Sequence, residues 1–400
     1  MASKFFNVRV LIVATATIFI LIQIRLFTTQ STYVDRLATA ESRKRKSMPL
    51  IQGSQVPSEP LAAVVIMACN RPEYLERTIE SVLKHRSSVA SKFPIFVSQD
   101  GTNPDVKRKA LSYNQIRHIQ HLNLQPVHPE RPGEIVAYYK ISRHYKWALD
   151  ELFFKKNFSR VIILEDDMEI APDFFDYFEA TATLLDNDKS VMAVSSWNDN
   201  GQRQFVLDAE ALYRSDFFPG LGWMLTKSTW VELSPKWPKA YWDDWLRLKV
   251  VRKNRQFIRP EICRTFNFGE HGSSMGLFFK QYLEPIKLND ARINWKEMDL
   301  GYLKEGNFSK HFAKIVADAK PLYGADVIQQ ASNIDGDVRI RYSDQSEFER
   351  IARQFGIFQE WKDGIPRTAY KGVVVFRYKT SRRVFLVGPA SLRQLQIENI

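Results

Sequence analysis

Arg160-Val-Ile-Ile-Leu-Glu-Asp-Asp-Met168 joins four apolar residues to three consecutive carboxylates. The apolar run Val161–Leu164 predicts a strand that is buried on both faces. Adjacent negative charges repel one another, so Glu165, Asp166 and Asp167 favour a compensating cation. Carboxylate oxygens suit Mg²⁺ or Mn²⁺, which can bridge to phosphate. Open α/β sheets bind ligands at the carboxyl ends of their strands, so this stretch predicts a ligand site at a sheet edge.

A second interpretation of the same stretch is a solvated acidic turn. Acidic residues are favoured near the first turn of a helix, and Ala171-Pro172-Asp173 has the composition of a helix start. On this segment alone, both interpretations stay open.

The flanking sequence alternates strand-like and helix-like segments, which predicts a parallel α/β sheet. The expected strands are 62–67, 94–100 and 191–194, and the expected helices are 73–84, 138–154 and 173–185. The sequence contains neither GxGxxG, the fingerprint of dinucleotide-binding folds, nor GxxxxGK[ST], the P-loop motif. Beyond about residue 308, the helix 347–355 and the strands 373–378 and 383–387 predict a smaller α+β region.

The N-terminus has an apolar run, Val10–Ile22, inside the longer segment Phe5–Phe27. The 23 residues of the longer segment can span a bilayer, and no small-residue cleavage site follows them. We therefore expect a retained signal anchor, followed by a polar stem over residues 28–60.

The net charge of +12 is unevenly distributed along the chain. Residues 1–60 hold eight Lys/Arg and three Asp/Glu, a net +5, and no dense basic block follows, so nucleic acid is not the expected partner. Composition alone leaves open whether Cys69 and Cys263 form a disulfide. Asn157 and Asn307 begin glycosylation sequons.

Tyr241-Trp-Asp-Asp-Trp245 places two acids between aromatic rings. Aromatic faces stack on sugars, and a carboxylate in a partly apolar setting suits general-base chemistry. Equally, the acids could cap a helix over Asp244–Val251, with the tryptophans in the core. Two further segments are also ambiguous. The glycines of Phe217–Trp223 could let the backbone approach a ligand closely, or they could form a tight corner before a strand. Trp197–Gly201 could line a cleft, or it could be only a loop.

Taken together, several blocks closely resemble the N-acetylglucosaminyltransferase I family, and their sequences are most similar to those of its plant members. The blocks occur in the same order within about residues 61–387, and they are RVIILEDDMEIAPDFFDYF (160–178), SWNDNG (196–201), RSDFFPGLGWML (214–225), KWPKAYWDDW (236–245) and RPEICR (259–264).

The resemblance implies a type II Golgi membrane protein whose catalytic domain has the Rossmann-like GT-A fold. Such enzymes use UDP-GlcNAc and Mn²⁺ and transfer GlcNAc, with inversion, in β-1,2 linkage to the α-1,3-linked mannose of a Man5GlcNAc2 N-glycan on glycoproteins. The expected organisation is a cytosolic tail over 1–4, the anchor over 5–27, the stem over 28–60, the GT-A domain over 61–271, a mobile loop and linker over 272–307, and a smaller C-terminal α+β domain over 308–400.

The resemblance also implies roles for single residues. Asp167 matches the direct metal ligand. Asp243 matches the catalytic base, which takes the proton of the acceptor hydroxyl. Positions that match donor contacts are Arg71, Asp100, His144, Glu165, Asp166, Trp242 and Ser274. The loop Glu270–Tyr282 is expected to order when the donor binds.

One departure concerns the cysteines. In the register of the animal members, Cys69 faces Gly101 rather than a second cysteine, so we expect free thiols at Cys69 and Cys263. Two other hypotheses belong to different classes: a metal-dependent nucleotidyltransferase, which does not need the aromatic rings around Asp243, and a Golgi lectin or tether, which needs no catalytic base.

Overall fold

The computed structural model of the chain describes residues 59–273, 276, 278–324, 326–379 and 381–397. The predicted tail, the anchor over 5–27 and all but the last two residues of the stem lie outside these ranges. Among the helices within them, none combines the length and apolar character that crossing a membrane requires.

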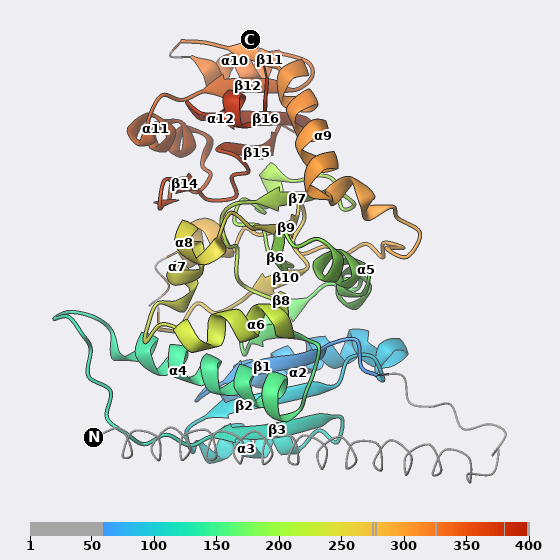
Figure 1. The fold of residues 1–400 in the computed structure, drawn as a ribbon, viewed down its shortest axis with the longest axis vertical. Helices are drawn as coiled ribbons and strands as arrows, with labels where there is room; N and C mark the ends of the chain where they lie inside the picture. The colour runs from blue at the N-terminus through green and yellow to red at the C-terminus, as the bar shows by residue number, and fades with distance from the viewer. Residues whose placement is uncertain (1–58, 274–275, 277, 325, 380, 398–400) are drawn as a thin grey trace, which may run out of the picture. The chain divides into compact units, whose positions relative to one another are not determined.

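A mixed sheet of eight strands forms the centre of the body (Figure 1). Its strands, in spatial order, are β3 (Ile116–His121), β2 (Ile95–Asp100), β1 (Ala63–Ala68), β4 (Arg160–Glu165), β8 (Trp223–Thr226), β6 (Val191–Ser195), β9 (Gln256–Pro260) and β7 (Leu212–Ser215). The predicted α/β class is confirmed. The prediction of a wholly parallel sheet is wrong for β8 and β7, which pair antiparallel with their neighbours.

Alternate residues of β1 point into two different cores, because successive side chains of a strand face opposite sides of the sheet. Val64 and Ile66 pack with the helices of one face, and Val65 and Met67 pack with those of the other. The first face carries α2 (Pro72–Arg86), α3 (Pro104–Leu111) and α5 (Phe174–Asn187). The second carries α4 (Val136–Asp150), α6 (Lys227–Leu233) and α7 (Trp242–Arg247).

A helix predicted over Asp244–Val251 is in fact two short helices, α7 and α8 (Lys249–Arg252). Leu248, with ψ of 135°, is extended and separates them. The N–H of Lys249 donates to an Asp363 carboxylate oxygen at 2.7 Å instead of to the Trp245 carbonyl four residues back. A side chain from the C-terminal part of the chain therefore ends α7 and caps α8.

The C-terminal part contains a second sheet, with strands in the order β11 (Lys320–Leu322), β12 (Val338–Arg341), β16 (Arg382–Val387) and β15 (Val373–Tyr378). The strands predicted over 373–378 and 383–387 are confirmed as β15 and β16, which pair antiparallel as a hairpin. Helix α9 (Glu305–Asp318) packs on one face, and α10 (Val327–Asn333) and α11 (Gln345–Phe355) pack on the other. The short α12 (Ser391–Gln394) and the two-residue strands β13 (Trp361–Lys362) and β14 (Ile365–Pro366) complete this part.

A two-stranded ribbon crosses the carboxyl edge of the central sheet. Strand β5 (Met168–Ile170) directly follows the acidic cluster and pairs antiparallel with β10 (Thr265–Asn267). The acidic cluster therefore leads into a strand, and α5 begins only at Phe174.

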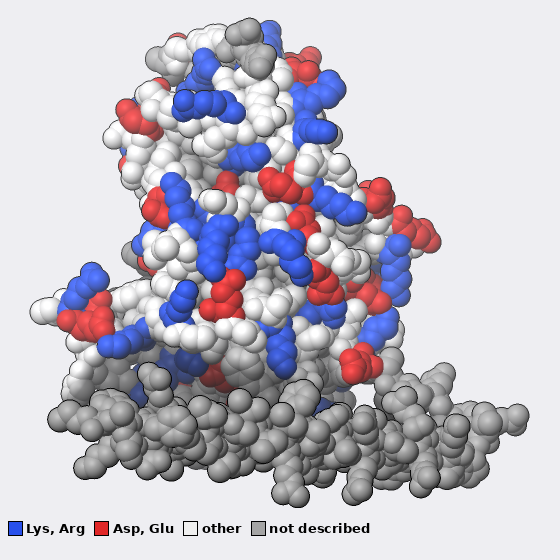
Figure 2. Space-filling model, viewed as in Figure 1, with Lys and Arg blue, Asp and Glu red and all other residues white. Residues whose placement is uncertain are grey.

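Charged side chains of both signs intermingle over the face drawn in Figure 2, wherever the described residues are visible. This mixed distribution agrees with the dispersed charge of the body seen in its sequence.

Candidate active site

The carboxyl ends of β1 and β4 place Arg71 against the acidic cluster. The two strands are parallel neighbours, with Met67 opposite Glu165, so the turns that follow them meet at one edge. The Arg71 guanidinium forms ion pairs with Asp166 and, at 2.9 Å, with an Asp167 carboxylate oxygen. Two carboxylates thus share one cation, and this leaves the cluster with an excess of negative charge.

The acidic cluster is buried rather than solvated. Asp166 is 4% exposed and Asp167 is 6% exposed, so the interpretation as a solvated acidic turn is wrong. Burial raises the pKa of Asp166 to about 6, although the charge of Arg71 opposes the rise. Burial also raises the pKa of Glu165 to about 7, and the neighbouring charge of Asp167 adds to the rise. Such an arrangement costs stability and favours the arrival of a cation.

Tyr145, on α4, connects the acidic cluster to the aromatic segment of α7. Its hydroxyl donates to a Glu165 carboxylate oxygen at 2.7 Å, and its ring stacks on Trp242 with centroids 4.4 Å apart. Trp242 is 7% exposed and also stacks on Trp223 and Trp237. The Trp242 ring therefore belongs to the core, while it brings its neighbour Asp243 toward the acidic edge.

Asp243 keeps 43% of its side chain exposed, and its neighbour Asp244 keeps 36%. Arg247, one helical turn on and buried, donates to Asp243 at 3.0 Å and to Asp244 at 2.8 Å. Lys362, from β13, holds the second Asp244 oxygen at 2.9 Å. Burial alone would raise the pKa of Asp244, but the hydrogen bond from Lys362 and the charge of Arg247 lower it. Both Asp244 oxygens thus accept from a cationic side chain, whereas Arg247 holds only one oxygen of Asp243.

Residues at the end of β10 enclose Asp167 from the other side. The Asn267 amide donates to Asp167 at 2.9 Å, and the Phe268 N–H donates to the Asp167 carbonyl at 2.9 Å. A Cβ on Gly269 would collide with the Asp167 carboxylate. Glycine is required at 269 because the backbone approaches the carboxylate closely. Arg71 also donates to the His271 carbonyl at 2.9 Å, which ties this segment to the cluster.

Asp100 and His144 lie in a second polar cluster, at the ends of β2 and β3. His121 donates its Nδ1–H to Asp100 at 2.7 Å, and its ring stacks on His144 with centroids 5.7 Å apart. His144 is buried and bonds the Ser98 hydroxyl at 2.8 Å. The Cys69 thiol lies within electrostatic reach of both clusters: burial raises its pKa, and the charges of Asp100 and Asp166 raise it further.

The buried His144 makes stability depend on pH. Burial lowers its pKa to about 4, although the Asp100 charge opposes this. The unfolded chain has a His pKa of about 6.5 and binds the proton more readily, so the free energy of unfolding falls as pH drops from about 6.5 toward 4. This group should cost about 2 kcal/mol of stability by pH 5. Urea unfolding at pH 7.5 and 5 measures it: His144→Gln should lose about 2 kcal/mol less than wild type on acidification, whereas the exposed His311→Gln should behave like wild type. Equal losses in His144→Gln and wild type would contradict this expectation.

The donor set at the acidic edge fits a hard divalent cation held jointly with a ligand. Among the described residues, no group of three or more His, Cys, Asp or Glu side chains is placed to hold a metal without further ligands. A cation at Asp167 would therefore need phosphate or water oxygens as well. Mg²⁺ and Mn²⁺ sites in nucleotide enzymes commonly combine one or two carboxylates with substrate phosphates. In the structure the Asp167 oxygens accept hydrogen bonds from Asn267 and Arg71, so a cation would share the carboxylate with these donors or displace one of them.

Sequence reasoning missed four residues that hold this edge together: Tyr145, Asn267, Arg247 and His121. Arg247 could have been identified, because it stands three and four residues after the two acids on one helix. The other three come from segments without a motif. Ser274 lies outside the described residues, and its predicted role stays a prediction. Both cysteines are free, Cys69 exposed and Cys263 buried.

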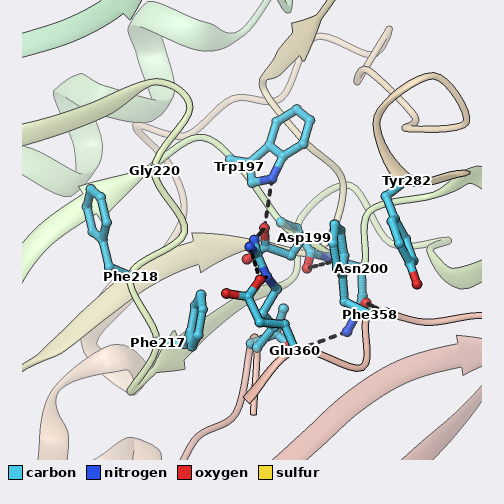
Figure 3. A network of polar contacts seen from close by, with 12 residues as sticks. Trp197, Asp199, Asn200, Phe217, Phe218, Gly220, Tyr282, Phe358 and Glu360 are labelled. Atoms are coloured by element: carbon cyan, nitrogen blue, oxygen red, sulfur yellow. Dashed lines mark hydrogen bonds and ion pairs between the residues drawn. The ribbon is translucent and has the colours of Figure 1, made fainter. Parts of the chain in front are cut away.

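The segment Trp197–Gly201 is a buried loop rather than the lining of an open cleft (Figure 3). Asp199 pairs with Arg367 at 2.6 Å, and the Asn200 side chain accepts from the Phe358 N–H at 3.1 Å. The loop therefore joins the central sheet to the C-terminal part of the chain.

The glycines of Phe217–Trp223 form a tight corner before β8. Gly222 has a φ of +93°, and a Cβ there would collide with the Ser196 hydroxyl. The interpretation as a tight corner is confirmed.

The family is decided by comparison with known proteins. A model of the GNT-I family matches residues 45–399, nearly the whole chain. The chain belongs to the GNT-I family. The family resemblance predicted from the sequence is confirmed.

A relative from Arabidopsis thaliana, alpha-1,3-mannosyl-glycoprotein 2-beta-N-acetylglucosaminyltransferase, is 60% identical over an alignment that covers 98% of each chain. Two solved structures show weaker similarity. The mannosyltransferase PcManGT from Pyrobaculum calidifontis, in complex with GDP-Man and Mn²⁺, is 15% identical, with a TM-score of 0.32 over 56% of this chain and 61% of that one. TarS 1–349 from S. aureus, in complex with UDP, is 11% identical, with a TM-score of 0.36 over 50% and 58%. The identification of this GNT-I family member therefore rests on the family match and the Arabidopsis relative.

Proposed function

We propose that this GNT-I family member transfers GlcNAc from UDP-GlcNAc, in β-1,2 linkage and with inversion, to the α-1,3-linked mannose of a Man5GlcNAc2 N-glycan on glycoproteins. The activity is the one named for its 60% identical relative. The observation that carries the site assignment is the connection from the buried acidic cluster, through Tyr145 and Trp242, to the exposed carboxylate of Asp243. A donor site and a base thus lie on one continuous set of contacts.

In this mechanism the acidic cluster binds the donor and Asp243 activates the acceptor. The acceptor hydroxyl is a weak nucleophile, so Asp243 takes its proton as the hydroxyl attacks the anomeric carbon in line. Attack on the face opposite the leaving UDP gives inversion, as in inverting glycosidases. Arg247 orients the Asp243 carboxylate through its ion pair at 3.0 Å.

Donor binding is assigned to the residues around the carboxyl ends of β1, β2 and β4. Arg71, Asp166 and Glu165 would bind the diphosphate and the sugar, Asp100 and His144 would bind the uridine, and Ser274 would close over the diphosphate. His144 is buried, bonds Ser98 and stacks on His121, which bonds Asp100, so it suits a role in positioning Asp100 through His121. Asp167 would hold Mn²⁺, which supplies Lewis-acid neutralisation of the leaving diphosphate when bound.

The GT-A fold, the division into 61–271, 272–307 and 308–400, and the Golgi location belong to the same proposal. A single-pass type II anchor over 5–27 would place the catalytic body in the lumen. The exposed Asn157 and Asn307 are then available for glycosylation there.

Product analysis tests the proposed activity. The full-length chain is incubated with UDP-GlcNAc, Mn²⁺ and Man5GlcNAc2, and the glycan is analysed by mass spectrometry and linkage-specific digestion. We expect one β-1,2-linked GlcNAc on the α-1,3 arm, and no transfer to a glycan that lacks this arm. Absence of acceptor-dependent UDP release from well-folded protein would contradict the transferase and favour a lectin or tether.

A further inference from the structure

Two tyrosine rings lie together beside the exposed carboxylate of Asp243. Tyr138 comes from the first turn of α4, and Tyr241 immediately precedes α7. Their ring centroids are 4.9 Å apart and their planes are inclined by 35°. Both side chains are half-buried, so each keeps part of its surface in contact with solvent. The pair thus forms an aromatic surface that the core leaves partly uncovered.

The backbone of Tyr241 is held in a conformation that tyrosine seldom adopts. Its φ of 51° and ψ of 47° lie in the left-handed region, which favours glycine over a bulky side chain. The Tyr241 carbonyl accepts from the Trp245 N–H at 3.0 Å, which fixes this start of α7. Conformations of this kind persist where the surroundings hold them, and they cluster at functional sites. Here the conformation sets the Tyr241 ring against Tyr138.

The surroundings of the tyrosine pair suit a sugar. Asp243 is two residues from Tyr241, and burial together with the charge of Asp243 raises the pKa of Tyr138, so carboxylate and rings are close. Aromatic faces pack against the C–H face of a pyranose, and the hydroxyls of that pyranose then reach a neighbouring carboxylate. The combination of a partly open aromatic surface and a base at its edge is what a hydroxyl-donating sugar requires.

The tyrosine pair is separated from the donor side of the site. Tyr145, which bonds Glu165, stands seven residues after Tyr138 on the same helix. Seven residues of α-helix correspond to about 10 Å along its axis. Trp242, which follows Tyr241 in the chain, stacks on Tyr145, Trp223 and Trp237 in the core. A donor sugar on Glu165 would leave the tyrosine pair free for a second sugar.

We propose that Tyr138 and Tyr241 form the stacking platform for the acceptor mannose, which they hold with its reactive hydroxyl at Asp243. This assignment rests on the proposed function, because it takes Asp243 as the base and a mannose-bearing glycan as the acceptor. Neither tyrosine contacts the acidic cluster, so the platform acts on the acceptor and leaves the donor unaffected.

The test separates acceptor binding from donor binding in the full-length chain. The variants are Tyr138→Leu and Tyr241→Gly, the second of which suits the left-handed backbone and therefore preserves folding. The KM for Man5GlcNAc2 should rise about fivefold to tenfold in each, as expected for loss of one stacking ring. The Kd for UDP should stay within about twofold of wild type. Tyr138→Phe should retain the wild-type KM for the glycan, and Tyr323→Leu, at a tyrosine that is 65% exposed elsewhere, is the control.

An unchanged KM for the glycan in both variants would overturn the platform, and so would a weaker UDP affinity with an unchanged glycan KM. A separate binding measurement distinguishes this failure from failure of the proposed function. Saturation-transfer NMR with Man5GlcNAc2 and UDP should show mannose contacts in wild type that Tyr138→Leu and Tyr241→Gly lose, whether or not the chain turns over. Retention of these contacts in both variants, or their absence in wild type, would overturn the platform even if transfer is observed.

Discussion

Asp243→Asn should lower kcat by about 10² to 10⁴-fold while UDP-GlcNAc still binds, since a positioned general base contributes about this much. The amide keeps the size of the carboxylate but accepts no proton from the acceptor hydroxyl. Donor affinity is retained because Asp243 is separated from the acidic cluster by Trp242 and Tyr145. A loss confined to kcat identifies an interaction used in the chemical step.

Asp244→Asn is the matched control for this variant. Asp244 is adjacent, shares Arg247 with Asp243 and is further engaged by Lys362. Asp244→Asn should lower kcat far less than Asp243→Asn does. Steady-state kinetics with Man5GlcNAc2 and calorimetric titration with UDP-GlcNAc provide both readouts. Normal turnover in Asp243→Asn, or a larger defect in Asp244→Asn, would refute the assignment of the base.

Asp167→Asn should have the second large effect, a fall in kcat/KM of about 10³-fold, on the order of 4 kcal/mol. The proposed reason is loss of the one carboxylate that would hold Mn²⁺ at the leaving diphosphate. Without metal, the same variant should be more stable than wild type by roughly 1 kcal/mol. Removing the Asp167 charge relieves the repulsion that helps to raise the pKa of Glu165, and Arg71 keeps its partner Asp166.

Two measurements check these opposite effects. Titration of UDP in the presence of Mn²⁺ should show weaker binding by Asp167→Asn, and thermal unfolding in metal-free buffer should show a higher Tm. Asp105→Asn, at an exposed acid on α3, should change neither quantity. If UDP binding by Asp167→Asn depended on Mn²⁺ as strongly as in wild type, the assignment of Asp167 as the metal ligand would be wrong.

The sequence predicted the parallel strands that the structure has as β1, β2 and β4, because apolar runs followed by polar turns mark buried strands. The resemblance implied that Arg71 and the acidic cluster serve one donor site, and the structure pairs Arg71 with Asp166 and Asp167 at the shared edge of β1 and β4. Sequence reasoning missed the antiparallel β8 and β7. Their four-residue runs carry no periodicity that distinguishes direction, and only pairing with distant strands decides it.

In the candidate site, too, some features were visible in the sequence and others depended on tertiary contacts. Glu165-Asp166-Asp167 was visible as a motif, yet its two interpretations stayed open until burial of Asp166 and Asp167 removed the solvated turn. The prediction of one helix over Asp244–Val251 was wrong because Asp363, more than a hundred residues away, caps α8 at Lys249. Residues with no motif of their own, such as Tyr145 and Asn267, complete the site only through long-range contacts.

By itself, the sequence determined the α/β class, the family and the chemistry of the candidate groups, because strand and helix propensity, carboxylates and aromatic rings are local properties. Only the tertiary structure decided which acids are buried, which one keeps an exposed oxygen and which rings remain uncovered. The physical reason is that burial, shared cations and pKa shifts depend on neighbours that are distant in the chain. Asp167 and Asp243 are the same type of side chain, and only their surroundings distinguish them: Asp167 is 6% exposed, whereas Asp243 keeps 43% of its side chain exposed.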